Sequence, residues 1–384
     1  MLYFCSGFND HFYTIFGMNR VFNRLFFSLI FLLLTPLAVL SQEHENEDHH
    51  EGHAKEKGTG EMILEHVTDA HCLHFFETET FHATVPLPCI VYGPNGIDFF
   101  MSSNLYGHHG EPVPYTAGSG TTYVLDKEVM KYVNEKGELV TALDLSITKT
   151  VLGLFIGIGL MLLIFTKIAR RYKTNPLSSP KGTQSFFEPL IMFIRDDVAK
   201  PAIGPRHEAF MPFLLTVFFF ILICNVLGLI PFIGGFNITG NIAVTLVLAT
   251  LVFIITSAKA TGHYWMHIIN PPGIPLWLLP IMIPVEIVGV ISKPFVLMLR
   301  LFANVTAGHI IILAFTSLIF IFYGKFGVGG AVGASVVSVA FSIFMNLLEL
   351  LVAFLQAYVF TLLAALYFGG AIEEAHHGHE EAHH

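Results

Sequence analysis

Residues 294–315 read PFVLMLRLFANVTAGHIIILAF and place one arginine, Arg300, well inside an apolar run. An ionisable side chain at the centre of a membrane helix costs about 3 kcal/mol on insertion scales. Arginine cannot lose its proton to escape that cost, and the sequence has no acidic residue within one helical turn of Arg300. The stretch therefore predicts a membrane helix whose arginine has a function. A snorkelling or structural arginine is the alternative.

The composition of the whole chain also indicates a membrane protein. Of its 384 residues, 53% are hydrophobic and 13% are charged, whereas about 25% are charged in an average soluble domain. Residues 209–372 contain only six Asp, Glu, Lys or Arg residues. The formal net charge of −9 leaves no basic surface for nucleic acid. We therefore expect an all-α polytopic membrane protein that binds no nucleic acid.

Six apolar runs have the length of membrane helices or of parts of them. They are 147–166, 210–233, 240–258, 274–291, 295–322 and 331–368. The run 274–291 contains Pro275, Pro280 and Pro284, so we expect an interrupted lead-in to the next helix and not a separate span. About five transmembrane helices then remain.

The last run is too long for an upright helix. Its 38 residues would extend about 57 Å at about 1.5 Å per residue, while the hydrocarbon core is about 30 Å thick. Either the run breaks near the Gly- and Ala-rich stretch 327–335, or its helix lies about 58° from the membrane normal. We expect the last two helices to be long and steeply tilted.

Residues 1–41 have the layout of a secretory signal peptide. Arg20 and Arg24 precede the apolar run LFFSLIFLLLTPLAVL, and small residues follow before an acidic stretch. The natural start is then Met1 or Met18. A short membrane anchor that is retained is the alternative.

Residues 42–146 are expected to form an acidic, His-rich extracytoplasmic segment. They contain 18 acidic residues, five lysines and ten histidines, which favours a solvated leader at the start of the segment. Weak capture of a metal such as Zn²⁺ is the alternative. Apolar and polar residues alternate on both sides of the turn signal PNG at 94–96, which predicts a small β-hairpin. Cys72 and Cys89 would meet oxidising conditions and could pair.

The charge on either side of the first span, 147–166, predicts the orientation. The connector 167–206 has eight Lys or Arg and three Asp or Glu, against a net charge of −13 over 42–146. The positive-inside rule places the amino terminus outside and the connector in the cytoplasm. Five crossings place the His-rich tail, 373–384, in the cytoplasm as well. Within the connector, apolar residues of 185–204 recur at helical spacing and predict an amphipathic helix on the membrane surface.

Polar residues fall on one face of the helix that contains the arginine. Glu286, Lys293 and Arg300 follow one another at steps of seven, which places them on one face of an ideal helix. Asn304 lies one turn further along that face, whereas His309 points away from it.

The final helix has a second polar set. Glu349 and Gln356 are seven residues apart, and Asn346 lies beside Glu349. This helix, packed against the one that contains His309, could line a narrow polar path for ions through apolar surroundings. Hydrogen bonds that only lock the two helices together are the alternative.

Several motifs together resemble those of one family. They are RLFANVTAGH at 300–309, PVEIVGVISKP from Pro284, NVLGLIP from Asn225, TGNIAVTLVLATL from Thr239 and ELLVAFLQAYVFTLL from Glu349. In order and spacing they resemble subunit a of the F-type ATP synthases over about 207–372. The segment 42–140 and the tail 373–384 lie outside this resemblance.

The resemblance implies a proton-translocating stator subunit. Arg300 matches the family's essential arginine, which faces the carboxylates of the c-subunit ring and acts as an electrostatic gate between two half-channels. The implied partners are this ring, the b-subunit peripheral stalk, membrane lipid and protons, in a bacterial inner membrane. No cofactor or metal is implied. The chain has no GxxxxGK[ST] motif, so ATP chemistry would belong to other subunits.

The resemblance also implies a proton path. His309 and Glu349 match two positions that relay protons in the half-channel from the outer side, and Asn304 and Gln356 match polar residues beside it. Glu286 matches an acid on the path toward the cytoplasm. A polytopic metal-ion transporter with His-rich ends is the alternative function.

Overall fold

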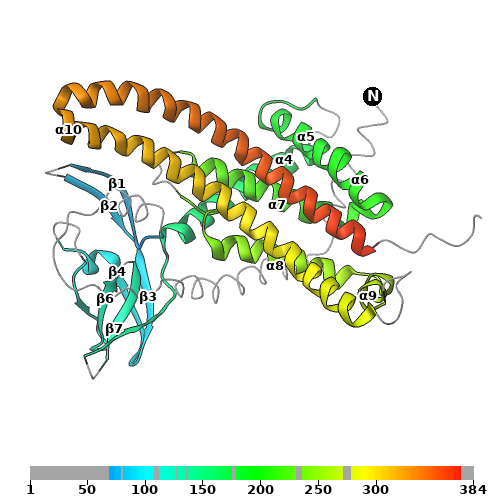
Figure 1. Ribbon diagram of the computed structural model, residues 1–384, viewed down its shortest axis with the longest axis horizontal. Helices are drawn as coiled ribbons and strands as arrows, with labels where there is room; N and C mark the ends of the chain where they lie inside the picture. The colour runs from blue at the N-terminus through cyan, green and yellow to red at the C-terminus, as the bar shows by residue number, and fades with distance from the viewer. Residues whose placement is uncertain are drawn as a thin grey trace, which may run out of the picture.

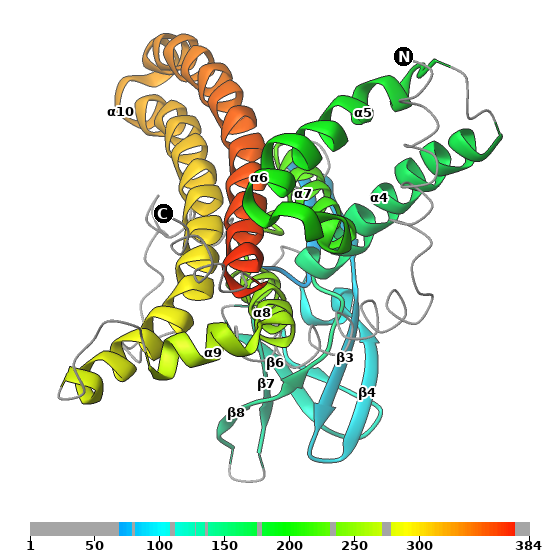
Figure 2. The ribbon, with the colours of Figure 1, turned by 90° about the vertical axis from the view of Figure 1, so that its right-hand side faces the viewer.

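The computed structural model describes most of the chain between residues 69 and 372. The described ranges are 69–78, 81–107, 112–126, 128–134, 137–174, 179–230, 236–270 and 278–372. A β domain lies at one end of a set of long helices, and the two longest helical segments run side by side (Figures 1 and 2). The predicted signal peptide, 1–41, and the tail, 373–384, fall outside the described residues.

Three antiparallel sheets make up the β domain. In the first, β1 (Cys72–Thr78) pairs with β2 (Phe81–Pro86). In the second, β3 (Pro88–Gly93) lies between β4 (Gly96–Met101) and β9 (Leu143–Asp144). The third has the order β5 (Tyr115–Thr116), β6 (Thr122–Asp126), β7 (Val129–Val133) and β8 (Leu139–Thr141). A short 3-10 helix, Ser102–Leu105, follows β4.

The predicted hairpin around residues 94–96 is confirmed as β3–β4. Its register pairs Pro88 with Met101 and Gly93 with Gly96. The prediction of a single hairpin was nevertheless too small, because the described residues form nine strands. Strands as short as the two residues of β5 and β9 are too short to show a periodic pattern.

The β domain is joined to the helices by shared packing. Leu73 and Leu87 of the domain lie in one apolar cluster with Leu154 and Cys224 of the membrane helices. Asp69 accepts hydrogen bonds from the Thr148 hydroxyl at 2.8 Å and the Thr150 amide at 3.0 Å, where the first long helix begins. A carboxylate at a helix amino terminus satisfies donors that have no partner within the helix.

Seven α-helices follow the β domain in the described chain. They are α4 (Lys149–Thr174), α5 (Thr183–Phe193), α6 (Lys200–Ile203), α7 (His207–Gly228), α8 (Ile242–Lys259), α9 (Gly262–Ile269) and α10 (Leu279–Ile372). A π-helical turn, Ile194–Ala199, joins α5 to α6, and a 3-10 turn, Gly204–Arg206, leads into α7. Five segments are long and apolar enough to cross a membrane, which confirms the predicted number, and α5 confirms a helix in the connector.

The long element α10 is a helical hairpin of two arms. Gly327 interrupts the helix with φ 65° and ψ −157°, in the left-handed half of φ space that glycine adopts without a Cβ clash. We call residues 279–326 the first arm and residues 328–372 the second arm. The arms run antiparallel, the first in yellow and orange and the second in orange and red (Figures 1 and 2).

Both arms are longer than a membrane is thick. Each contains an apolar stretch of 41 residues, which extends about 60 Å at about 1.5 Å per residue. Against a hydrocarbon core of about 30 Å, such a helix must lie about 60° from the normal. The helix is unbroken over the predicted run 331–368, because its interruption at Gly327 lies before that run. The predicted break near 327–335 is therefore found at Gly327, and the helix that follows it is still long enough to require tilting.

The predicted interruption in the run 274–291 was wrong for its described part. The helix continues through Pro284 and Pro294 with helical backbone angles. Pro280 lies in the first turn of α10, where a proline displaces no hydrogen bond, and Pro275 falls outside the described residues. The run is part of the first arm and, as predicted, not a separate span.

Candidate functional site

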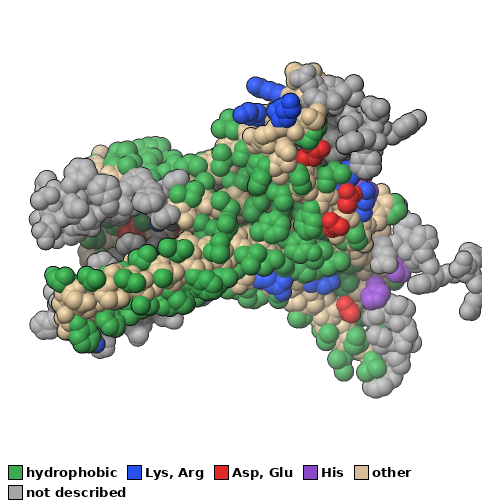
Figure 3. Space-filling view, turned by 90° about the horizontal axis from the view of Figure 1, so that it is seen from above, with side chains coloured by type: hydrophobic (Ala, Val, Ile, Leu, Met, Phe, Trp, Pro, Cys, Tyr) green, Lys and Arg blue, Asp and Glu red, His purple; other side chains and the backbone are tan. Residues whose placement is uncertain are grey.

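Arg300 lies on the exposed side of the first arm. Its side chain is exposed, whereas Leu297 and Leu301 beside it are buried in the core that the arms share with α7 and α8. The arm is thus fixed by its apolar side and turns its arginine outward. A large part of the surface of both arms around it is apolar (Figure 3).

One turn along, the two arms are joined by a pair of amide side chains. The Asn304 Nδ2 group donates to Gln356 Oε1 at 2.9 Å. Gln356 is buried, at 4% exposed, while Asn304 lies at the edge of the contact. The sequence placed these residues on faces of two different helices, and the structure brings them together.

One turn further, a carboxylate of the second arm presses against the backbone of the first. A Cβ atom built on Gly308 would lie 2.6 Å from Glu349 Oε1, so glycine leaves room for the carboxyl group in this position. Glu349 Oε2 is buried and has no hydrogen-bond partner among the described residues. A buried carboxylate oxygen of this kind requires a hydrogen-bond partner such as water, or it binds a proton. His309 follows Gly308 in the first arm, and the structure describes its backbone only.

Asn346 is one predicted residue that the structure does not bring into this contact. Its Nδ2 group donates to the Ser342 carbonyl of its own helix at 2.9 Å, and its side chain is exposed. It precedes Glu349 by almost one turn on the same arm.

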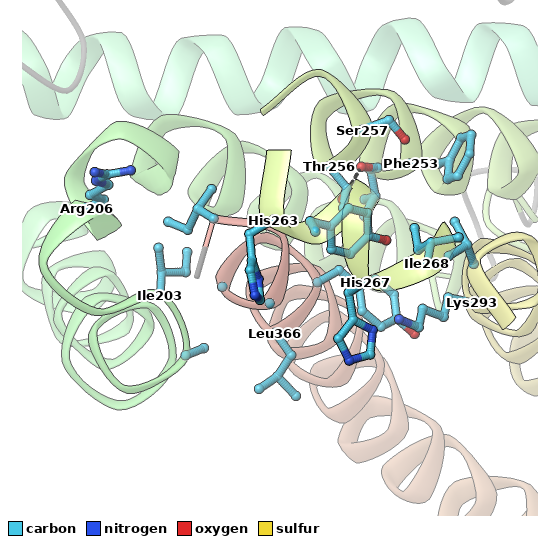
Figure 4. Close-up of a pocket in the computed structure, with 18 of the residues that line it drawn as sticks. Ile203, Arg206, Phe253, Thr256, Ser257, His263, His267, Ile268, Lys293 and Leu366 are labelled. Carbon is cyan, nitrogen blue, oxygen red and sulfur yellow. Dashed lines mark hydrogen bonds between the residues drawn. The ribbon is translucent and has the colours of Figure 1, made fainter. Parts of the chain in front are cut away.

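Glu286 lies far from this contact, in a cavity of about 1180 Å³ at the other end of the first arm. Lys293, one step of seven along the arm, lines the same cavity, and its Nζ lies 5.7 Å from the centre of the Tyr367 ring of the second arm. Glu286 and Lys293 thus lie on one face of the arm, and the backbone stays helical at Pro294. Residues from α6, α8 and α9 also line the cavity (Figure 4).

Two histidines of this cavity were not singled out from the sequence. His263 and His267 of α9 both line it, and their spacing of four places them on one side of that helix (Figure 4). The HxxxH spacing was the available signal. Among the described residues no group of three His, Cys, Asp or Glu side chains is placed to hold a metal ion.

A buried polar link behind the second arm was also missed. Thr239 Oγ1 donates to Asn225 Oδ1 at 2.5 Å, and Asn225 Nδ2 donates to the Ala353 carbonyl at 3.4 Å. The link joins three parts of the chain. Asn225 belongs to α7, Thr239 to the short segment before α8, and Ala353 to the second arm, between Glu349 and Gln356. It holds the polar face of the second arm in place.

The β domain has a charged cluster of its own. His71 is 2% exposed, and its Nε2 lies 2.7 Å from Asp144 Oδ2 while its Nδ1 lies 3.4 Å from Glu128 Oε2. Burial alone would lower the pKa of His71, but hydrogen bonds and charge interactions with the two carboxylates outweigh burial and raise the pKa to about 10. Although burial opposes it, contact with His71 lowers the pKa of Asp144. The imidazolium of His71, just before β1, therefore holds Asp144 in place five residues before α4 begins at Lys149.

The two cysteines of the β domain are buried thiols and form no disulfide. Burial raises the pKa of Cys72 to about 11 and of Cys89 to about 12. Both thiols are therefore protonated at neutral pH and unreactive as nucleophiles.

Comparison with known proteins gives matches over both parts of the chain. A family model described as the ATP synthase A chain matches residues 151–369, and a domain of unknown function matches residues 62–151. The ATP synthase subunit a of Chlorobium phaeobacteroides strain DSM 266 is 47% identical over 272 residues, which cover 68% of this chain and 76% of the relative.

Two further relatives have the same description. The ATP synthase subunit a 2 of Chlorobium luteolum is 49% identical over 251 residues, covering 62% of this chain and 71% of the relative. The ATP synthase subunit a of Chlorobium phaeobacteroides strain BS1 is 39% identical over 339 residues, which cover 87% of this chain and 81% of the relative. The long tilted arms, the site between them and these matches agree, and the chain belongs to the family of the ATP synthase A chain, the a subunit of ATP synthase.

Proposed function

We propose that this a subunit conducts protons through two half-channels that meet at Arg300, and so couples a proton gradient to rotation of a c-subunit ring. The observation that carries the proposal is the Asn304–Gln356 hydrogen bond, with Glu349 packed against Gly308 one turn further on. This contact puts a carboxylate and two amides in one line between the arms, where each would otherwise be costly in a membrane.

The outer half-channel in this proposal follows the contact between the arms. Arg300, Asn304 and Gly308 are spaced by four along the first arm, so the Glu349 carboxylate lies about 12 Å from the level of Arg300 along the helix. His309 and Glu349 pass the proton, and the Asn304–Gln356 pair offers both donors and acceptors between them and Arg300. Asn346 adds a polar group one turn beyond Glu349.

The cytoplasmic half-channel in this proposal is the cavity at Glu286. The cavity contains Glu286 and Lys293, and Glu286 lies 14 residues from Arg300, or about 21 Å along the helix. Arg300 thus lies between the two polar regions, with apolar helix surface on both sides. Neither region alone crosses the membrane.

Arg300 acts as an electrostatic gate because its charge is fixed. A carboxylate of the c ring that faces Arg300 is held in its ionised form, whereas one that faces lipid must be neutral. Each ring site therefore takes a proton from one half-channel and releases it to the other. A membrane potential supplies about 2.3 kcal/mol per charge per 100 mV to this transfer. The positive charge also stops protons from leaking directly between the half-channels.

The proposed orientation follows from charge. Lys and Arg residues cluster in the last turns of α4, and the acidic β domain precedes this helix, so the β domain lies outside the cytoplasm and the tail 373–384 inside. The exposed apolar sides of the arms face the c ring and lipid, and a b-subunit stalk holds the subunit against rotation. The membrane is the bacterial inner membrane. Family membership favours this function over metal transport.

The test is ATP synthesis by membrane vesicles that contain Glu349→Gln. Glutamine has nearly the same size but cannot carry a proton, so we expect synthesis and ATP-driven proton pumping to be lost while the complex assembles. Glu138→Gln, the same change at an exposed carboxylate of the β domain, is the matched control and should leave both activities intact. Normal synthesis in Glu349→Gln would refute the proposed outer half-channel.

A further inference from the structure

The outward side of the three-stranded sheet β4–β3–β9 consists entirely of apolar residues. We call it the apolar face, and its residues are Pro88, Ile90, Tyr92, Ile97, Phe99, Met101, Leu143 and Leu145. They form one continuous patch, because Tyr92 pairs across the sheet with both Ile97 and Leu143, and Ile90 pairs with Phe99. Phe99 is 74% exposed and Ile97 is 57% exposed. Patches of this kind mark interaction sites.

The polar residues of this sheet lie on its other side. Asp98 and Asp144 are buried, at 7% and 4% exposed. Asp98 accepts a hydrogen bond from the Tyr123 hydroxyl at 2.8 Å, and Asp144 contacts His71. An antiparallel sheet with one solvated side normally turns its polar residues to the solvent. This sheet buries its carboxylates and exposes its aliphatic and aromatic residues instead.

The four-stranded sheet of the same domain has polar residues on its outward side, as is usual for an antiparallel sheet with one solvated side. Its outward residues include Thr116 and Thr122, whose hydroxyls lie 3.0 Å apart, and the ion pair of Lys131 with Asp126 at 2.7 Å. Thr141 of β8 is also exposed. Val133 and Leu139 are exposed on the same side, so this side mixes polar and apolar residues, whereas the apolar face has no charged residue.

The apolar face leads along the chain into a helix that is long and apolar enough to cross a membrane. Leu143 and Leu145, both exposed, come just before α4, which begins at Lys149. In α4 the exposed side chains are again apolar, such as Phe155 and Leu163 at 48% and 70% exposed. A helix of this length and composition crosses the membrane, so the sheet starts at the membrane boundary.

We infer that the β domain lies on the membrane surface and dips its apolar face into the lipid headgroup and upper acyl region beside α4. Lipid requires no complementary charge, and the apolar face has no charged residue. Tyrosine is enriched at this depth of a bilayer, where its ring is in apolar surroundings and its hydroxyl in water. Apolar side chains of interfacial segments typically reach about 5–10 Å into this region. The domain would thereby brace the outer end of α4.

The test is quenching of a fluorescent label in the assembled ATP synthase in lipid vesicles. Phe99→Cys and Ile97→Cys place the label on the apolar face, and Thr141→Cys places it beside Lys131 on the outward side of the four-stranded sheet as the matched control. The unsubstituted protein, treated in the same way, gives the background from its own cysteines. Lipids with a nitroxide near the headgroup report contact with lipid, and iodide reports contact with water.

For residues 97 and 99 we expect the nitroxide lipid to remove most of the fluorescence and iodide to remove little. For residue 141 we expect the reverse. Strong quenching by iodide at both positions of the apolar face would overturn the inference, because the face would then be in water. Protection from both quenchers would overturn it as well, because a protein partner would then cover the face.

Discussion

Gly308→Ala should move the Glu349 carboxylate without destabilising the helices. The added Cβ would lie 2.6 Å from Glu349 Oε1 and 3.0 Å from its Cδ. To restore a contact of about 3.5 Å, the carboxyl group must move by about 0.9 Å. Because it is the end of a flexible side chain, it moves while the backbone stays. A displacement of about 1 Å lowers the rate of a step that depends on geometry by about 100-fold.

The rate of proton transfer should fall, but the stability of the helices should stay the same or rise. Alanine favours a helix over glycine by about 1 kcal/mol, so thermal unfolding of the purified subunit should occur at the same or a slightly higher temperature. The assay is ATP-driven proton pumping in inverted vesicles. Gly289→Ala is the matched control, since it lies on the same arm and a Cβ there meets no atom of the chain within 4 Å. Normal pumping in Gly308→Ala, or a loss of pumping accompanied by a lower unfolding temperature, would refute the reasoning.

Two further predictions concern pairs of residues. His71→Ala leaves Asp144 buried without its cation and should destabilise the β domain by about 3–5 kcal/mol. The pKa of His71 is raised to about 10 from 6.5, so the stabilisation that its positive charge provides is complete below pH 6.5 and is lost as the pH rises to about 10. The unfolding temperature of the variant should lack this pH dependence. An unfolding profile over pH identical to that of the unsubstituted protein would contradict the ion pair. Gln356→Leu removes the partner of Asn304 and should slow ATP synthesis, whereas Asn346→Leu should slow it less; equal losses would contradict the special role of the pair.

The membrane part was largely predictable because its signals are local. The apolar runs, their excess length and the glycine-rich turn at 327–335 all lie within short stretches of sequence. The prolines were misleading, since Pro284 and Pro294 are accommodated in the first arm without a break. Helix propensity is a weak prior that packing between long helices can override.

The features that could not be predicted from the sequence depend on contacts between residues far apart in the chain. The Asn225–Thr239 link and the contact of Glu349 with Gly308 join segments that no periodicity relates. The strands β5, β8 and β9 have only two or three residues, too few for a clear alternation. The sheet β4–β3–β9 places polar residues inside, against the usual pattern. The apolar face therefore emerged only from the folded structure.

The most direct test of the central claim is passive proton leak through vesicles with Arg300→Ala, measured together with ATP synthesis. We expect the complex to assemble, synthesis to be lost and protons to leak, because the two half-channels would no longer be separated by a fixed positive charge. Arg170→Ala, an exposed arginine at the end of α4, should show neither effect. Full ATP synthesis without leak in Arg300→Ala would contradict the proposed gate.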